Sequence, residues 1–393
     1  MGRTRSGMER LLASSPPWLK GKAKVGLLVH PASVDRDLHP VVERFQEAFP
    51  GRLQALFGPQ HGLWGDKQDN MVESPHEEVT PWGVPCYSLY AQSRVPSQEM
   101  LSRLDVLIVD LQDVGCRVYT FLATLLGCLE ACAEAQVRVV VTDRPNPIGG
   151  VEIEGNLLVP SMTSFVGCHP MPMRHGMTLG ELALLMKAER GLDVELEVVT
   201  MQGWKRGLSF SETGLPWVPP SPNIPTPETC WVYPGQVLLE GTNLSEGRGT
   251  TRPFEVFGAP FIDPFLLRDR LRGAPLPGVA FRPLYFEPTF NKWHGQRCGG
   301  LQLHVKDPKV FRPYLATLCI LHEVLREWGE QMAWREPPYE YETQRLPLDL
   351  LAGDPRIRLG LEEGVHPCEM EQSWRPDLEL WLQRRERYLA YPC

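Results

Sequence analysis

The stretch "DVLIVDLQDVG" (residues 105–115) decides the fold, together with the segments that follow it, "TFLATLLGCLEACAEAQ" (120–136) and "VRVVVTDRPNP" (137–147). The first and third are short, nearly continuous apolar runs, which are typical of strands buried on both faces. The middle segment carries apolar residues at helical spacing. A buried strand, an amphipathic helix and a second buried strand predict one unit of a parallel sheet.

The same alternation extends in both directions along the chain. On the N-terminal side lie the runs "KVGLLVH" (24–30), "RLQALFG" (52–58) and "VPCYSLY" (84–90), with the helical segment "HPVVERFQEAF" (39–49) between the first two. On the C-terminal side we expect a helix that starts at Thr178 with Glu181 in its first turn, and then the strand "LEVVTM" (196–201). From about Gly258 a strand-like "LQLHV" (301–305) and a helical "RPYLATLCILHEVLREW" (312–328) indicate a smaller α+β domain that lids the sheet.

The composition argues against several classes of protein. The chain of 393 residues has a net charge of -8 and no basic run with interleaved aromatic residues, so we expect no nucleic-acid partner. No apolar stretch reaches the roughly 18 residues of a membrane span, so none is expected. The apolar core of a signal peptide is also missing, which predicts a cytoplasmic protein whose ten cysteines are reduced thiols. The sequence leaves the oligomeric state open.

The motifs of the common cofactor sites are absent. After the first predicted strand the chain reads "HPASVDRD" (30–37), without the GxGxxG that a dinucleotide requires. GxxxxGK[ST], HExxH and the GxSxG of serine hydrolases do not occur either. No cluster of His, Asp and Cys has the spacing of metal ligands. We therefore expect neither a cofactor nor a catalytic metal.

Polar residues follow four of the predicted strands, in "HPASVD", "GPQHG", "DLQDVGCR" and "DRPNP". Ligands of parallel sheets bind beyond the carboxyl ends of the strands, so these segments predict a cleft there. The candidates are Gln60 and His61, Asp110 and Asp113, and Asp143, Arg144 and Asn146. A structural interpretation stays open for several of them: one aspartate caps the helix that begins near Thr120 and the other binds backbone amides, Asp143 pairs with Arg144, and Asx and Pro residues build the turn.

Two further segments contribute candidates. In "EGTNLSEGRGTT" (240–251), the polar side chains of Glu240, Asn243, Ser245, Glu246 and Arg248 crowd among three glycines. Glycine allows the backbone to approach a ligand closely, and an arginine offers a fork for a carboxylate, so a functional role is favoured here. His175, in "PMRHGMT", either takes part in the site or simply ends a loop before the helix.

Seven motifs in this order carry a resemblance: "FGPQHGLWG", "DLQDVGCRVYTFLATL", "DRPNPIGG", "SFVGCHPMPMRHGMTLGELA", "PSPNIPTPETCWVYPG", "EGTNLSEGRGTTRPFEVFGAP" and "GVAFRPLYFEPTFNKWHGQRCGGLQLHV". From Lys24 to Val305 the chain resembles the NamZ-type exo-β-N-acetylmuramidase family. The resemblance implies an N-terminal extension (1–23), a Rossmann-like domain (24–257) and a smaller C-terminal domain (258–393), with the active-site cleft between the two domains.

The resemblance also implies the activity, which is the release of terminal N-acetylmuramic acid from the non-reducing end of peptidoglycan fragments in cell-wall recycling. The lactyl group of this sugar is a carboxylate, for which Arg248 and Arg174 are the candidate partners. The substrate-binding residues implied are Gln60, His61, Asp143, Arg144, Asn146, Arg174, His175, Asn223, Asn243 and Arg248.

One position departs from the family pattern. The motif "GPEHG" of the family carries a proposed catalytic acid, and this chain has Gln60 there, which cannot donate and recover a proton. Three interpretations stay open. The protein binds the sugar without hydrolysing it, another acid acts, or the family's glutamate is not the acid; a hydrolase of another acidic amino sugar is a further alternative. The candidate catalytic carboxylates are Glu73, Asp69, Asp113 and Glu246, with Asp66 and Asp110 beside them.

Overall fold

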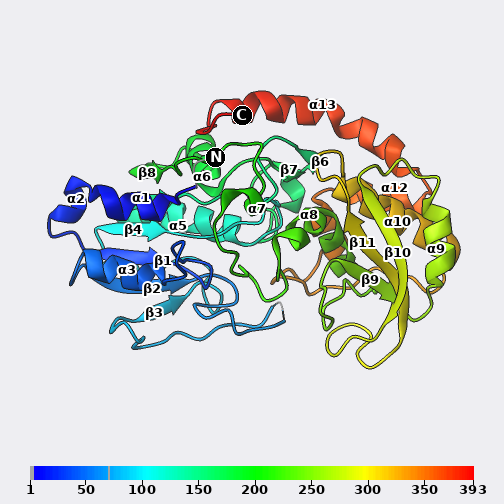
Figure 1. Ribbon diagram of the computed structural model, residues 1–393, viewed down its shortest axis with the longest axis horizontal. Helices are drawn as coiled ribbons and strands as arrows, with labels where there is room; N and C mark the ends of the chain where they lie inside the picture. Colours follow the sequence, from blue (N-terminus) through cyan, green and yellow to red (C-terminus); the bar gives the residue numbers. More distant parts are fainter. Residues whose placement is uncertain (1–3, 70) are drawn as a thin grey trace.

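A six-stranded parallel sheet forms the centre of the N-terminal half of the protein, as seen in a computed structural model that describes residues 4–69 and 71–393 (Figure 1). The strand order is β3-β2-β1-β4-β5-β8, and every neighbouring pair is parallel. The strands are β1 (Val25–Leu28), β2 (Leu53–Gly58), β3 (Cys86–Ser88), β4 (Val106–Val109), β5 (Arg138–Thr142) and β8 (Leu196–Val199). The predicted parallel sheet is thus confirmed.

Helices cover both faces of this sheet, because alternate residues of each strand point to opposite sides. In β4, Val106 and Ile108 pack in one apolar cluster with α1 (Gly7–Ser14) and α3 (Val41–Ala48). Leu107 and Val109 pack in the other, with α5 (Phe121–Ala135) and α6 (Leu179–Arg190). The predicted N-terminal extension therefore places a helix against the sheet. Two short helices, α2 (Pro17–Lys20) and α4 (Gln98–Leu101), complete this half.

The start of α6 agrees with the sequence pattern, whereas the start of α5 does not. At α6 the side chain of Thr178 accepts a hydrogen bond from the amide of Glu181, whose carboxylate in turn accepts from the amide of Thr178. This confirms the predicted start. At α5 the structure does not support the interpretation, left open above, that an aspartate caps the helix, because Thr120 occupies the N-cap position and no side chain caps the helix. Asp110 instead pairs with Arg144, and Asp113 accepts from a loop amide.

The C-terminal half contains a smaller antiparallel sheet of order β10-β11-β9. Its strands are β9 (Val256–Ala259), β10 (Val279–Phe286) and β11 (Cys298–Val305). Its helices are α8 (Pro227–Gln236), α9 (Pro264–Leu271), α10 (Pro313–Trp328), α11 (Pro347–Ala352) and α12 (Pro355–Glu362). In α8, a Cβ atom on Gly235 would lie 1.9 Å from the carbonyl oxygen of Pro313, so only glycine permits this contact with α10.

The two halves are joined by shared packing. A single apolar cluster runs from Leu107 and Leu125 under the parallel sheet to Leu318 and Trp381 in the C-terminal helices. Between the halves lie a two-stranded sheet, β6 (Glu154–Leu157) and β7 (Pro172–Arg174), and the short elements η1 (Pro160–Met162), α7 (Phe210–Thr213) and η2 (Val237–Gly241). The division at residues 257 and 258 stays a prediction.

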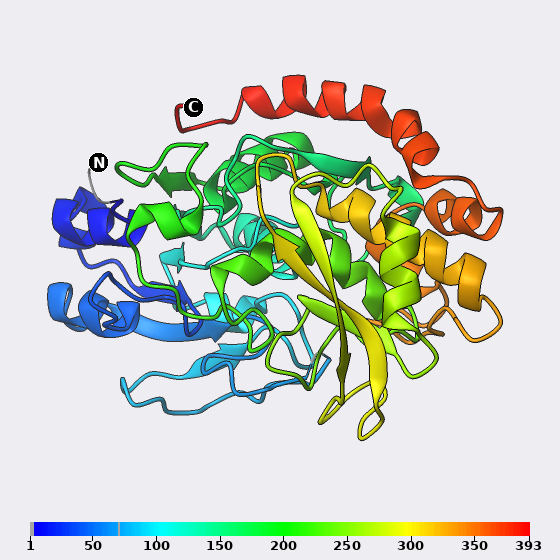
Figure 2. The ribbon, with the colours of Figure 1, turned by 45° about the vertical axis from the view of Figure 1, so that its right-hand side comes forward.

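The last helix, α13 (Pro367–Glu386), runs along the outside of the molecule and returns the chain to the N-terminal half. Figure 1 and Figure 2 show its red ribbon extending from the C-terminal helices back over the N-terminal half of the molecule. None of the helices in the described part of the chain is long and apolar enough to cross a membrane.

Candidate active site

A pocket lies where loops from the carboxyl ends of the parallel strands meet the C-terminal half. Its empty space is about 430 Å³, which includes the open mouth, but its interior cavity volume is only about 40 Å³. Both Gln60, which follows β2, and Arg248, which follows η2, line it, as the strand-end and glycine-loop patterns predicted. The remaining lining residues are His61, Val118, Tyr119, Thr120, Val166, Ser221, Ile224, Tyr233, Val237, Glu240, Phe254, Tyr339 and Glu340.

Gln60 is fixed by two neighbours in the pocket. Its Oε1 accepts a hydrogen bond from Thr120 Oγ1 at 2.5 Å, and its Nε2 donates to Glu340 Oε1 at 3.1 Å. The side chain of Gln60 is buried, so both contacts are protected from water. The amide therefore joins the N-terminus of α5 to a carboxyl group that comes from residue 340.

Glu340 is the carboxyl group that the sequence analysis missed. It lies on the loop between α10 and α11 and is only 6% exposed. Its Oε2 accepts a hydrogen bond from the hydroxyl of Tyr90 at 2.7 Å. Burial, and to a smaller degree the nearby charge of Glu240, raise the pKa of Glu340 above its usual value, although the Tyr90 and Gln60 hydrogen bonds act in the opposite direction. A buried acid with a raised pKa thus faces the pocket.

A second carboxylate, Glu240, lies in the same pocket in a different environment. Its Oε1 accepts a hydrogen bond from Arg248 Nη1 at 2.8 Å, and its Oε2 accepts from the hydroxyl of Tyr339 at 2.7 Å. The guanidinium also donates to Glu246 Oε1 at 2.9 Å, and Lys292 Nζ donates to Glu246 Oε2 at 2.9 Å. Contact with these two cations holds the pKa of Glu246 at about 2 in spite of its burial.

His61 adds a neutral imidazole to the pocket wall. Its Nδ1 lies 2.8 Å from the carbonyl oxygen of Lys67 and must donate there, which leaves Nε2 to accept from the hydroxyl of Ser221 at 3.2 Å. Burial, with a contribution from the charge of Arg248, lowers the pKa of His61 to about 4. His61 has φ of 70°, a left-handed conformation that turns the chain sharply after the strand.

Comparison with known proteins assigns the chain. It matches two consecutive family models, "Exo-beta-N-acetylmuramidase NamZ, N-terminal" over residues 25–228 and "Exo-beta-N-acetylmuramidase NamZ, C-terminal" over residues 231–391. The chain belongs to the NamZ family. The peptidoglycan beta-N-acetylmuramidase NamZ of Bacillus subtilis (strain 168) is 42% identical over 390 residues, which are 99% of this chain and 92% of that protein.

Two solved structures share the fold of this NamZ family member, both DUF1343 family proteins from Bacteroides fragilis NCTC 9343. The first superposes with a TM-score of 0.90 at 34% identity and covers 99% of each chain. The second has a TM-score of 0.78 at 27% identity, over 100% of this chain and 99% of the other. The likeness therefore extends over both halves of the molecule.

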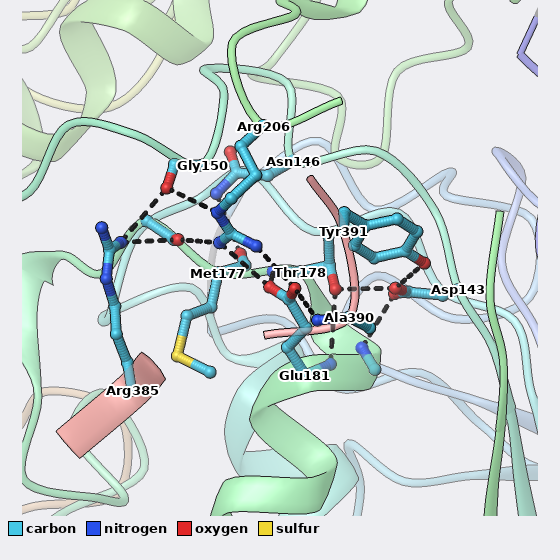
Figure 3. A network of polar contacts seen from close by, with 12 residues as sticks. Asp143, Asn146, Gly150, Met177, Thr178, Glu181, Arg206, Arg385, Ala390 and Tyr391 are labelled. Atoms are coloured by element: carbon cyan, nitrogen blue, oxygen red, sulfur yellow. Dashed lines mark hydrogen bonds and ion pairs between the residues drawn. The ribbon is translucent and has the colours of Figure 1, made fainter. Parts of the chain in front are cut away.

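Several of the predicted NamZ site residues serve the framework around the sheet. Arg144 donates to both oxygens of Asp110, at 2.7 and 2.9 Å, so it pairs with the aspartate of the neighbouring strand and not with Asp143. Asp143 accepts instead from Tyr391 and Thr178, as Figure 3 shows. Burial raises the pKa of Asp143 to about 7.

The rest of the network in Figure 3 is equally structural. Asn146 donates to the carbonyl oxygen of Met177 at 2.9 Å and accepts from the amide of Ile148 at 3.1 Å. The carboxylate of Glu181 accepts hydrogen bonds from Arg206 Nη1, at 2.6 Å, and from the amide of Ala390, at 2.8 Å. These contacts bind the C-terminal tail to α6 and to the turn after β5.

Asp113 and His175 form a buried pair behind the pocket. Asp113 Oδ2 lies 3.5 Å from His175 Nε2 and accepts from the amide of Gly115 at 2.7 Å. The amide of Met177 donates to His175 Nδ1, which places the remaining ring proton on Nε2, toward the aspartate. Neither residue belongs to the pocket lining.

Three further predicted binding residues lie outside the lining. Arg174 donates to the carbonyl oxygen of Ile148 and lies 5.3 Å from the ring of Trp231, in a separate cavity. Asn223 donates to the carbonyl oxygen of Gln68 at 2.7 Å. Asn243 donates to the carbonyl oxygen of Gln331 at 2.8 Å. The last two asparagines hold loops that border the site.

The predicted catalytic carboxylates are not in the pocket wall. Glu73 is exposed, and the hydroxyl of Tyr341 lies 3.4 Å from its Oε1. Asp69 accepts from the side chain of Asn291 at 2.8 Å. Glu246 contacts Arg248, which lines the pocket, but Glu246 itself does not line it. A catalytic role for these residues and for Asp113 stays a prediction. The one signal for Glu340 was the segment "PPYEYE" (337–342), in which prolines and aromatic residues make an ordered loop rather than a charged tail.

Among the described residues, one group of His and Asp side chains is close enough to share a cation, namely Asp35, Asp37 and His39. Asp37 and His39 are exposed, and none of the three lines the pocket.

Proposed function

We propose that this protein is an exo-β-N-acetylmuramidase, a glycoside hydrolase that releases terminal N-acetylmuramic acid from the non-reducing end of peptidoglycan fragments. Membership of the NamZ family supports this, as does the printed name of the relative from Bacillus subtilis. The pocket contains two buried carboxyl groups, Glu240 and Glu340, which are the groups that most glycosidases use.

The position of Arg248 in the pocket is the observation that favours N-acetylmuramic acid as the sugar. The guanidinium is 6% exposed, lines the pocket, and has an Nε without a hydrogen-bond partner among the described residues. Arginine is well suited to bind a carboxylate with two parallel hydrogen bonds. N-acetylmuramic acid carries such a group on its lactyl ether, whereas N-acetylglucosamine does not. A buried arginine in the pocket therefore favours the acidic sugar.

The proposal is tested with two chromogenic substrates, 4-nitrophenyl β-N-acetylmuramide and the corresponding β-N-acetylglucosaminide. We expect the wild-type protein to hydrolyse the muramide and to leave the glucosaminide nearly untouched. A hydrogen bond to a charged group contributes about 1.5–3 kcal/mol. Arg248→Gln should therefore raise KM for the muramide by about 10- to 150-fold, since about 1.4 kcal/mol is a factor of ten.

The matched control is Arg252→Gln, which removes an exposed guanidinium of the same loop that is paired with Glu255. Its KM should equal that of the wild type. Thermal unfolding of both variants shows whether the loss of Arg248 acts on binding or on folding, because Glu240 and Glu246 lose a partner. If the muramide binds but is never cleaved, the protein is a sugar-binding protein and the proposal is wrong.

A further inference from the structure

We propose that Glu340 is the proton donor of the hydrolysis and that Glu240 is its ionised partner. This assignment rests on the proposed function and names the residues that perform it. Both side chains line one pocket, and each is more than nine-tenths buried. Glycosidases need one carboxyl group that keeps its proton and one that does not, and different surroundings produce that difference.

Burial is the feature of Glu340 that favours the neutral acid, against the two hydrogen bonds that it accepts. Its two oxygens contact an amide nitrogen, Gln60 Nε2, and a phenol, Tyr90, neither of which carries a charge. In the part of the chain that the structure describes, no lysine, arginine or histidine forms an ion pair with Glu340. The effect of burial exceeds the opposing effects of the two hydrogen bonds and of the charge of Arg248, so the pKa of Glu340 is raised.

Glu240 has partners of a different kind. One oxygen accepts from the guanidinium of Arg248 and the other from the hydroxyl of Tyr339. A charge-assisted hydrogen bond of this kind stabilises the ionised form. The loop of residues 339 and 340 thus supplies both the acid and, through Tyr339, a contact that orients its partner.

Gln60 fits this arrangement because it is an amide. Its oxygen is already occupied by the hydroxyl of Thr120, so its nitrogen faces Glu340 and can only donate. An ionised carboxylate at position 60 would have no hydrogen to give and would repel a charge on Glu340. The amide therefore positions the acid without competing for its proton.

The reaction balances with these two groups and one water molecule. Glu340 passes its proton to the glycosidic oxygen as the bond between that oxygen and C1 breaks. The water oxygen forms the new bond to C1, either directly, with its proton taken by Glu240, or after Glu240 itself has bonded to C1. In the direct route, Glu240 passes the water's proton on to solvent and Glu340 takes a new proton from solvent. In the other route, the ionised Glu340 takes its proton back from the attacking water as the water oxygen displaces Glu240 from C1. Both routes consume one water and release the sugar as a hemiacetal.

The experiment compares a poor and a good leaving group. Glu340→Gln, Glu240→Gln and the exposed control Glu336→Gln are assayed on N-acetylmuramyl-β-1,4-N-acetylglucosamine and on 4-nitrophenyl β-N-acetylmuramide. The alcohol of the disaccharide needs protonation, whereas nitrophenolate leaves without it. Glu340→Gln should lower kcat on the disaccharide by about 10²- to 10⁴-fold, the usual contribution of a general acid, and much less on the nitrophenyl glycoside. Glu240→Gln should lower both, and Glu336→Gln neither.

A second variant, Tyr90→Phe, tests the assignment independently through its pH profile. Tyr90→Phe removes one hydrogen bond that lowers the pKa of Glu340, so the alkaline limb of kcat/KM should move to higher pH. Equal losses of Glu340→Gln on both substrates, or an alkaline limb that Tyr90→Phe leaves in place, would overturn the assignment while the proposed function stands. A folded wild-type protein that cleaves neither substrate would overturn the proposed function and the assignment together.

Discussion

At the scale of single residues, Gln60 explains how a NamZ chain can lack a carboxyl group at this position. Its amide oxygen accepts a hydrogen bond from the hydroxyl of Thr120, and its amide nitrogen donates one to Glu340. Each polar atom of the side chain therefore has a partner. An acid at position 60 would stand within hydrogen-bond distance of another acid, and two such groups cannot both ionise easily. The position therefore serves the carboxyl group of Glu340.

This account predicts the effect of restoring the carboxyl group. Gln60→Glu should lower turnover of N-acetylmuramides at neutral pH, because the donor to Glu340 is lost and a second acid competes for its proton. Losing one buried hydrogen-bond partner costs about 1–3 kcal/mol. If that cost falls on the active arrangement, kcat/KM falls by about 5- to 150-fold. Gln60→Met, of similar shape, separates the lost donor from the added charge. A rise in turnover for Gln60→Glu would show that position 60 needs a carboxylate.

The sequence predicted part of this site at the residue level. Gln60 and His61 follow a buried strand, and Arg248 lies in a glycine-rich loop; all three line the pocket. Glu340 is 280 positions from Gln60, in a loop without hydrophobic periodicity, so only the tertiary fold reveals their contact. Asp143 and Arg144 also follow a strand, but their side chains are used by a neighbouring helix and by a neighbouring strand. A position at the end of a strand therefore does not tell whether a residue lines the pocket or bonds a neighbouring element.

At the scale of elements, the pocket is closed by loops. Its interior of about 40 Å³ holds a few water molecules, whereas small-molecule sites commonly offer about 300 Å³ or more. The loop after α10 contributes Tyr339 and Glu340 to the wall, and Arg94 and Glu73 lie against its next residue, Tyr341. We therefore expect this loop to move when a sugar enters the pocket.

The C-terminal tail has a different, structural task. After α13 the hydroxyl of Tyr391 donates to Asp143 Oδ2 at 2.5 Å and accepts from the amide of Met201 at 3.0 Å. Tyr391→Phe leaves the amide of Met201 without this partner and removes one of the two hydroxyl donors to Asp143, so it should lower the free energy of unfolding by about 1–3 kcal/mol, measured by urea titration. Turnover at moderate temperature should be unchanged, because none of these residues lines the pocket. Tyr388→Phe, from the end of α13, is the control. Equal stability of Tyr391→Phe and wild type would show that the network is dispensable.

The periodicity of the sequence located the main elements because local patterns determine them. The alternation of buried strands and helices gave the parallel order of β1, β2, β4 and β5, and the pair Thr178 and Glu181 marked the start of α6. The start of α5 was less readable. Its cap position is Thr120, whose hydroxyl is used by Gln60 in the pocket and not by the helix amides. The hydroxyl that could have capped the helix thus bonds a residue of the pocket instead.

At the scale of the whole molecule, one apolar core joins the parallel sheet to the C-terminal helices, and the pocket lies at their junction. Each half contributes part of the pocket wall. The N-terminal half supplies Gln60 and His61, and the C-terminal half supplies Glu240, Arg248 and Glu340. Activity should therefore depend on both halves being folded together.

The most direct test uses two disaccharides that differ only in order. The purified protein is incubated with N-acetylmuramyl-β-1,4-N-acetylglucosamine and, separately, with N-acetylglucosaminyl-β-1,4-N-acetylmuramic acid. The products are separated by chromatography and identified by mass spectrometry. An exo-acting muramidase releases free N-acetylmuramic acid from the first and leaves the second intact. Cleavage of the second disaccharide, or of neither, would contradict the account.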